Sequence, residues 1–255
     1  MKKTATLIGA FALSLLSFEG FSQMKLGVKA GLNATSFGYD LKDSEFEKEL
    51  KDGTQTKIGY HVGLAAEFGL SDNFALQTGL MWTTKGAKIE EKDSDFDPLS
   101  GSSYNMESKE TLTLNYLELP VNITYKISNF QIHAGPYLAI GVSGKGDYEM
   151  KTTVTFPGGT ESESENGEYD VKFKNTVEES DFDADEFVSF HRALDYGLNV
   201  GLGYTAGPVL LSANYSLGLG NTIPGYDGGG EDFSDDNKMT NKGFSVSATY
   251  FFNCK

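Results

Sequence analysis

Few side chains in this 255-residue chain have the types and spacing that hydrolysis needs. Its three histidines are His61, His133 and His191. Nucleophilic hydrolysis requires a His base beside a Ser and an acid. Ser143 and Ser212 share a predicted strand face with His61 and His133, but no G-x-S-x-G elbow is present. We therefore expect structural histidines that are hydrogen-bonded to their neighbours, and no enzymatic activity. A lipid-modifying enzyme is the alternative.

Acidic side chains recur at alternate positions in Asp181, Asp183 and Asp185. This spacing resembles the opening of a calcium loop, but the glycine and the distant glutamate of an EF-hand are missing. The stretch at 227–236 is similarly acidic. We expect solvated loops, with weak binding of Ca²⁺ or Mg²⁺ as the alternative. We predict no built metal site and no cofactor.

The elements that carry these side chains are predicted to be strands with two different faces. In Ile58–Phe68, apolar residues alternate with small or polar ones. A period of two indicates a strand. The eleven residues of this run match a tilted strand that crosses the hydrocarbon core of a membrane. Extended backbone can cross lipid only in a closed barrel, because an open edge would leave N–H and C=O groups unpaired.

Eight such strands can be drawn in the sequence. They lie near residues 24–36, 57–69, 74–87, 111–127, 130–145, 192–205, 209–220 and 242–252. The connections at 69–73, 128–129 and 205–208 are short, and those at 37–56, 88–110, 146–191 and 221–241 are long. Short turns on the side of both termini and long loops on the opposite side are typical of outer-membrane barrels. We predict an all-β fold, an eight-stranded antiparallel up-and-down transmembrane β-barrel.

The second face of these strands is polar or small and is expected to line the lumen. Small residues suit a crowded eight-stranded interior, and aromatic residues such as Tyr60 and Trp82 suit the lipid interfaces. A soluble lipocalin-like barrel, with the apolar face inside, is the alternative. The predicted lumen network consists of Glu67, Lys85, Glu118, Lys126 and His133. Because a buried carboxylate is costly without a partner, we expect an ion pair between Lys85 and Glu118.

Two stretches depart from simple alternation. In the strand at 111–127, the apolar residues move from even to odd positions at Leu117. A β-bulge near 115–117 would explain the change, and so would a strand that has left the bilayer above this point. In the longest connection, the segments 148–156 and 169–177 predict a hairpin above the membrane, with a mobile tip at 157–167.

The net charge and an N-terminal targeting signal limit the possible partners and location of the protein. The net charge of −15 argues against nucleic acid as a partner. Residues 145–189 hold thirteen Asp or Glu and four Lys, so this segment alone carries −9. Residues 1–22 have a basic start and a short apolar run, which is typical of a cleaved secretory signal peptide. Residues 23–255 form the predicted barrel domain, with a long acidic external loop at about 146–191. The single Cys254 cannot form an internal disulfide.

Several segments resemble the PorT-like outer-membrane β-barrel family. They include LGVKAGLNATSF (Leu26–Phe37), LNYLELPV (Leu114–Val121), HAGPYLAIGVSG (His133–Gly144) and DYGLNVGLGY (Asp195–Tyr204). LNYLELP followed by AGPY is the most specific part of the resemblance. It implies an integral barrel in the outer membrane of a Gram-negative bacterium, and the strand pattern places both termini in the periplasm.

We expect a structural or surface-interaction role for this chain. Its expected partners are outer-membrane lipid, divalent cations at the cell surface, and envelope or secretion proteins. One named member of the PorT-like family is an accessory of a protein secretion system. The resemblance therefore implies a secretion accessory as the alternative function.

Overall fold

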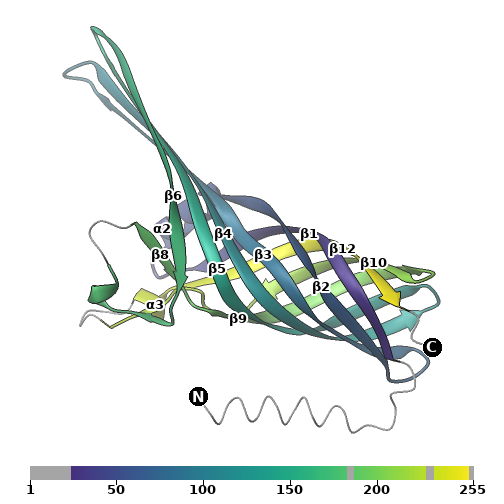
Figure 1. Cartoon of the computed structure of the whole chain (residues 1–255). Helices are drawn as coiled ribbons and strands as arrows, with labels where there is room; N and C mark the ends of the chain where they lie inside the picture. The colour runs from purple at the N-terminus through teal and green to yellow at the C-terminus, as the bar shows by residue number, and fades with distance from the viewer. Residues whose placement is uncertain (1–23, 183–186, 228–232, 253–255) are drawn as a thin grey trace.

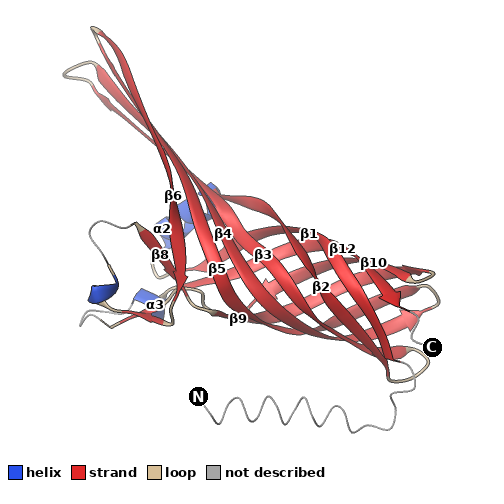
Figure 2. Ribbon diagram, in the orientation of Figure 1, coloured by secondary structure: helices blue, strands red, loops and turns tan. Residues whose placement is uncertain are grey.

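The computed structural model describes residues 24–182, 187–227 and 233–252. These residues form a β-barrel from which a sheet protrudes at one end (Figure 1, Figure 2). The expected signal peptide at 1–22 and Cys254 lie outside the described residues. Among the described helices, none is both long and apolar enough to cross a membrane.

Eight antiparallel strands close the barrel. They are β1 (Met24–Asp40), β2 (Thr54–Gly69), β3 (Phe74–Asp97), β4 (Ser102–Ile127), β5 (Phe130–Phe156), β9 (Leu194–Ala206), β10 (Val209–Gly218) and β12 (Lys238–Phe252). Each strand pairs with the strand before and after it in the ring, and β12 pairs with β1 to complete the closure. The predicted eight-stranded up-and-down barrel is confirmed.

The short turns set the register at one end of the barrel. Ser128 and Asn129 form a two-residue turn, with Ser128 at a φ of 55°. The predicted pairs of Lys126 with Gln131 and of Thr124 with His133 are both present. Polar side chains therefore meet polar side chains on the same face, as register in a two-faced strand requires.

The two faces of the strands differ sharply in exposure. On β9, the side chain of Val200 is 56% exposed on the outer face, whereas the adjacent Asn199 is 8% exposed in the lumen. Leu64 and Ile132 are likewise exposed, and Glu67 is buried. The apolar face thus points outward and the polar face points inward, which is the arrangement of a barrel in lipid.

Two hairpins extend far beyond the barrel as one sheet. Strands β3 and β4 form the first, and β5 with β6 (Gly159–Phe173) forms the second. Because β4 also pairs with β5 up to Ser103 and Thr155, the four strands stay joined. We call their protruding part, residues 88–111 and 147–168, the wing (Figure 1). The sequence predicted these strands to stop near 87 and to start near 111, so most of the 88–110 loop is strand instead.

The hairpin expected in the longest connection is present, but its turn is shorter than expected. The turn consists of Pro157 and Gly158, and Gly159 already pairs with Phe156. Glu161, which we expected in a mobile tip at 157–167, instead pairs with Val154 inside the sheet. Pairing with β5 makes this segment a strand, although its own sequence does not predict one.

The remaining connections contain short elements. They are α2 (Ser44–Gly53), β7 (Thr176–Val177), the 3-10 turn η2 (Glu179–Asp181), β8 (Val188–His191), β11 (Gly225–Tyr226) and α3 (Phe233–Asp236). The side chain of Asp43 caps α2 by accepting hydrogen bonds from the backbone N–H groups of Glu45 and Phe46, at 2.9 and 3.1 Å. Strand β8 pairs in parallel with the lower part of β6.

Strand β4 keeps the same two faces along its whole length. Its even positions point inward both in the upper half, at Leu114 and Tyr116, and in the lower half, at Asn122 and Thr124. Leu117 on the odd face is exposed. The apolar residues change face because the lumen itself changes, from polar in the lower half to apolar at the mouth. Of the two explanations offered for this change, a bulge on β4 is therefore wrong.

An irregularity does occur at the predicted height, but on the neighbouring strand. Asn115 pairs with Ser143, whereas Tyr116 pairs with Gly141, so the extra residue is Val142 of β5. As a result Ser143 is exposed rather than inward-facing as we expected, and its hydroxyl accepts a hydrogen bond of 3.2 Å from the Asn115 side chain.

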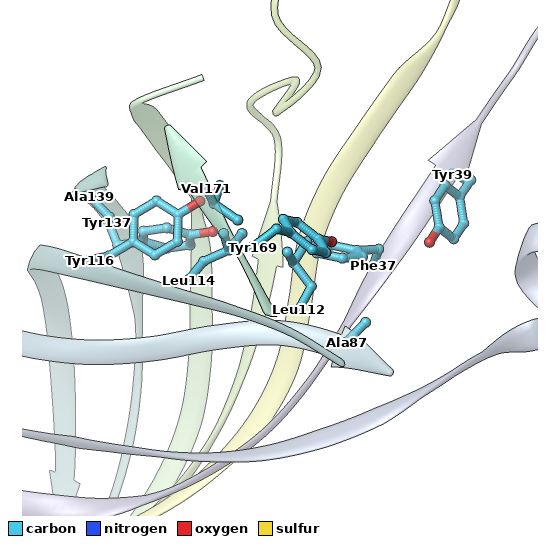
Figure 3. Close-up of a cluster of buried hydrophobic side chains, with 10 residues drawn as sticks. All are labelled: Phe37, Tyr39, Ala87, Leu112, Leu114, Tyr116, Tyr137, Ala139, Tyr169 and Val171. Carbon is cyan, nitrogen blue, oxygen red and sulfur yellow. The ribbon is translucent and has the colours of Figure 1, made fainter. Parts of the chain in front are cut away.

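An apolar cluster closes the mouth of the barrel below the wing (Figure 3). It consists of Phe37, Tyr39, Ala87, Leu112, Leu114, Tyr116, Tyr137, Ala139, Tyr169 and Val171. Tyr169 and Val171 come from β6, and Phe173 of the same strand packs against this cluster. The aromatic rings of Phe37 and His191 stack with centroids 6.3 Å apart. Strands β6 and β8 thus cover the end of the lumen.

Candidate functional site

A buried ion cluster lies in the upper lumen. The ammonium group of Lys85 on β3 is 2.8 Å from a carboxylate oxygen of Glu118 on β4 and 2.9 Å from one of Asp195 on β9. The same ammonium group lies 4.2 Å from the ring centroid of Tyr137. The structure thus places Lys85 and Glu118 together, as the sequence indicated, and adds Asp195.

Asp195 is fully buried, at 0% exposure, and is surrounded by donors. The Asn241 amide donates a 3.1 Å hydrogen bond to it, and the Tyr137 hydroxyl donates one of 3.3 Å. Sequence reasoning missed this carboxylate. The alternation of β9 could have revealed it: Tyr196 faces outward, so the residues on either side of it, Asp195 and Gly197, fall on the lumen face.

A second cluster lies at the end with the short turns. Its centre is Glu67, whose carboxylate is 2.5 Å from the ammonium group of Lys126 and 3.3 Å from that of Lys25. The Gln77 amide donates a further hydrogen bond of 2.8 Å to Glu67. Glu67 and Lys126 were both predicted in the lumen network, while Lys25 and Gln77 complete their coordination.

Two of the three histidines make contacts with amides rather than with acids. His61 Nδ1 is 2.6 Å from the Asn33 side-chain oxygen, and His133 hydrogen-bonds to the side chain of Asn214. His133 is buried in the lumen, as predicted, but lies apart from the Lys85 cluster. Among the described residues, no histidine hydrogen-bonds to a carboxylate.

The lumen is filled by these groups. Cavities of about 70 and 30 Å³ remain, and the larger is lined in part by Lys29, Asn33, Glu118 and Asn241. The ions link strands that are far apart in the ring, because β3, β4 and β9 meet at Lys85. Buried ion pairs and hydrogen bonds that join several strands hold those strands in one arrangement.

The wing has two faces of different character. Residues paired across antiparallel strands share a face, so the printed register sorts the side chains into rows. One row runs Asp95, Tyr104, Val154 and Glu161 across β3, β4, β5 and β6. This face continues the lumen face of the barrel, because it contains the row of Ala87, Leu112, Gly146 and Tyr169 below. We call it the inner face.

The charges of the wing divide unequally between its faces. The wing contains thirteen Asp or Glu and four Lys. By register, the inner face carries eight acids and no lysine. These acids are Glu91, Asp93, Asp95, Asp97, Glu110, Glu161, Glu163 and Glu165. The outer face therefore holds the remaining five acids and all four lysines.

The outer face pairs its own charges and hydroxyl groups. Lys92 and Glu107 form an ion pair of 3.2 Å across β3 and β4. The hydroxyl groups of Thr153 and Ser162 hydrogen-bond at 3.1 Å across β5 and β6. Such cross-strand pairs are typical of a solvated sheet face.

The candidate cation loop is only partly described. Asp181 forms an ion pair with Lys174, and Asp183 and Asp185 lie outside the described residues. The backbone N–H of Glu178 and the ammonium group of Lys174 lower the pKa of the Asp181 carboxyl. Within the described residues, no group of three or more His, Cys, Asp or Glu side chains is placed to hold a metal ion.

The comparisons with known proteins agree with this geometry. Residues 19–224 match the family model described as outer membrane protein beta-barrel domain. The chain belongs to this family. An outer-membrane barrel presents its exposed apolar face to lipid, which accounts for the exposure of Val200 and Leu64.

Solved structures that are similar to this outer-membrane barrel share little sequence with it. The attachment invasion locus protein Ail of Yersinia pestis is 10% identical, with 90% of this chain and 99% of that chain covered and a TM-score of 0.33. Neisserial surface protein A is 12% identical, with 91% and 100% covered and a TM-score of 0.33. The outer membrane protease OmpT of Escherichia coli is 11% identical, with 92% and 98% covered and a TM-score of 0.33. No curated protein shows a significant match to the sequence.

Proposed function

We propose that this outer-membrane barrel is a non-enzymatic surface-interaction protein whose wing is displayed outside the cell, with both termini in the periplasm. The observation that carries the proposal is the wing itself, a continuous four-stranded sheet that extends the barrel at the end opposite the short turns (Figure 1). Short periplasmic turns and long external segments are typical of this class of barrel.

The chemistry of the lumen supports a structural barrel beneath the wing. Both carboxylates of the upper cluster, Glu118 and Asp195, form ion pairs with Lys85. The apolar cluster at the mouth separates this network from the wing. The barrel therefore supplies anchorage and rigidity, and the recognition surface is the wing.

The PorT-like secretion accessory is the second candidate, and one observation favours it. The segments that carry the resemblance meet in the lumen. Glu118 belongs to LNYLELP, Tyr137 to AGPY and Asp195 to DYG, and all three contact Lys85 or one another. Comparison of the proteins secreted by a deletion strain and by its parent would separate this role from surface interaction. Mass spectra of lipid A from the same two strains test the lipid-modifying alternative.

Orientation is tested by labelling single cysteines in intact cells. In a Cys254→Ser background, Ser164→Cys places a thiol on the outer face of the wing, and Asp72→Cys places one in the short turn after β2. We expect a membrane-impermeant maleimide to label the first variant in intact cells and the second only after the outer membrane is permeabilised. The reverse pattern would overturn the proposed display.

Interaction is tested with the same display system. Cells that carry the full barrel are compared with cells that carry a variant in which residues 90–109 and 149–166 are replaced by short turns. Proteins captured from a detergent-solubilised outer membrane or from the medium by the full barrel, and not by the shortened one, would be partners of the wing. Identical capture by both would contradict a recognition role for the wing.

A further inference from the structure

We infer that the inner face of the wing is a docking surface for a cationic amphipathic helix. The biological setting of this inference rests on the proposed function, because the partner is external only if the wing is. The surface itself is defined by the sheet register and can be tested with purified protein.

The first observation is an apolar stripe along the two central strands of the inner face. It consists of Tyr104 and Met106 on β4 and of Tyr148, Met150, Val154 and Phe156 on β5. Met150 and Val154 are 39% and 36% exposed, so the stripe is open to solvent. On the outer face of the wing the corresponding positions are polar, and Phe96 on the edge strand β3 is its one large apolar side chain.

The second observation is a row of carboxylates along each side of this stripe. On β3 the row is Glu91, Asp93, Asp95 and Asp97, and on β6 it is Glu161, Glu163 and Glu165. With no lysine on the inner face, these carboxylates have no cation of the wing beside them. The Tyr148 hydroxyl donates a hydrogen bond of 3.4 Å to Glu165, which ties the stripe to its acidic border.

The third observation is that the base of the stripe already receives an aromatic side chain from elsewhere in the chain. The ring of Phe187 packs edge-on against Tyr169, with centroids 4.8 Å apart, and lies 6.2 Å from the ring of Tyr148. The base of the inner face therefore already packs against an apolar side chain that comes from outside the wing.

The dimensions fit a helix. Three strand spacings separate the two carboxylate rows, a width of about 14 Å. A helix with its side chains is about 10–12 Å across, so basic residues on both of its flanks would reach both rows. The stripe from Tyr148 to Phe156 is about 27 Å long, which corresponds to about 18 helical residues.

Charge complementarity selects this occupant. A helix with an apolar stripe between two basic flanks matches an apolar stripe between two acidic rows, with both charge sets left at the rim. An extended strand added to one edge of the wing would engage one acidic row and leave the apolar stripe uncovered. The balanced outer face provides neither the stripe nor the excess charge.

The test uses a designed peptide of 18 residues that forms a helix with a leucine face and lysines on both flanks. Its binding to the full barrel in phosphatidylcholine nanodiscs is measured by fluorescence anisotropy. The inner-face variant is Glu161→Gln/Glu163→Gln/Glu165→Gln. The matched control is Glu107→Gln/Glu149→Gln/Glu168→Gln, which removes the same charge from the outer face. A change in gel mobility on boiling that equals the change seen with wild type shows that both variants are folded.

We expect the inner-face variant to bind the peptide about tenfold more weakly than wild type, and the outer-face variant to change binding by less than about twofold. We also expect the bound peptide to gain helical circular dichroism, and a scrambled peptide of equal charge to bind no better than it binds empty nanodiscs. Equal losses in the two variants, or equal binding of the scrambled peptide, would overturn the inference, because the attraction would then follow net charge alone. A gain of strand signal by the peptide would overturn it in favour of edge pairing.

The two proposals fail in different ways. If cysteine labelling places the wing in the periplasm, the external role is lost, but the peptide-binding test with purified barrel is unaffected. If the peptide fails to discriminate between the faces, display of the wing at the cell surface is unaffected.

Discussion

The ring of Phe173 occupies the space that a side chain at position 141 would need. A Cβ added to Gly141 would lie 2.3 Å from Cε1 of this ring. Gly141 on β5 therefore lets β6 turn its last residue into the mouth of the barrel. Closure of the lumen depends on the absence of one side chain.

We predict that Gly141→Val displaces Phe173 and loosens the cover formed by β6 and β8, because overpacking forces neighbours to move. The measurement is the rate at which a protease nicks the 174–182 segment of the refolded barrel. Gly158→Ala is the control, since its added Cβ would lie 3.6 Å from the nearest atom, in ordinary contact. Equal nicking of the Gly141 variant and wild type would contradict this account of the mouth.

Lys85→Met should destabilise the barrel by about 3–5 kcal/mol, because Glu118 and Asp195 would remain buried without their cation. The quantity to measure is the free energy of unfolding in lipid vesicles. Lys145→Met breaks the exposed pair with Glu168 and should cost about 0–1 kcal/mol. Combining Lys85→Met with Glu118→Gln and Asp195→Asn should recover part of the loss. Similar costs for the two lysines would show that the cluster is not a desolvated ion network.

Val200→Arg places a charge on the lipid face and should cost about 2–4 kcal/mol near mid-bilayer. Val154→Arg makes the same chemical change on the wing, outside the membrane, and should fold with wild-type yield. Refolding yield in vesicles compares the two. If the Val200 variant refolds as well as the Val154 variant, the face at position 200 does not meet lipid.

The acidic segments should bind divalent cations only weakly, with dissociation constants near or above about 1 mM. Asp181 is already held by Lys174, which reduces its availability as a ligand. Calorimetric titration with Ca²⁺ tests this, together with protease sensitivity of the 145–189 region. No heat at millimolar Ca²⁺ and unchanged sensitivity would show that these charges do not hold divalent cations. Micromolar affinity would instead indicate a built site.

The barrel could be predicted because lipid imposes a strict pattern on it. In Ile58–Phe68, every second residue must be apolar and the intervening ones must fit a crowded lumen, so local alternation reports directly on the fold. The short turns then fix pairing by length alone. This reasoning needs no information from distant parts of the chain.

The wing and the mouth could not be predicted in the same way. Glu90–Asp97 has Phe96 as its one apolar residue, so no alternating apolar face marks it as a strand. Pairing with β4 orders it. The apolar residues change face at Leu117, and either a bulge or a change in the surroundings of the strand produces this same sequence pattern. Asp195 was missed because the alternation of its strand was followed only from Tyr196 onward, one residue too late to place Asp195 on the lumen face.

Strand β4 runs without a break for 26 residues, from the short turn after Ile127 to the tip of the wing. At the rise of an extended strand this is about 85 Å, of which roughly a third lies in the bilayer. Since three hydrogen-bonded strands, β3, β4 and β5, make this passage together, no hinge separates the tip from the membrane. A force applied at the tip of the wing is therefore transmitted to the whole barrel and tilts it against the surrounding lipid.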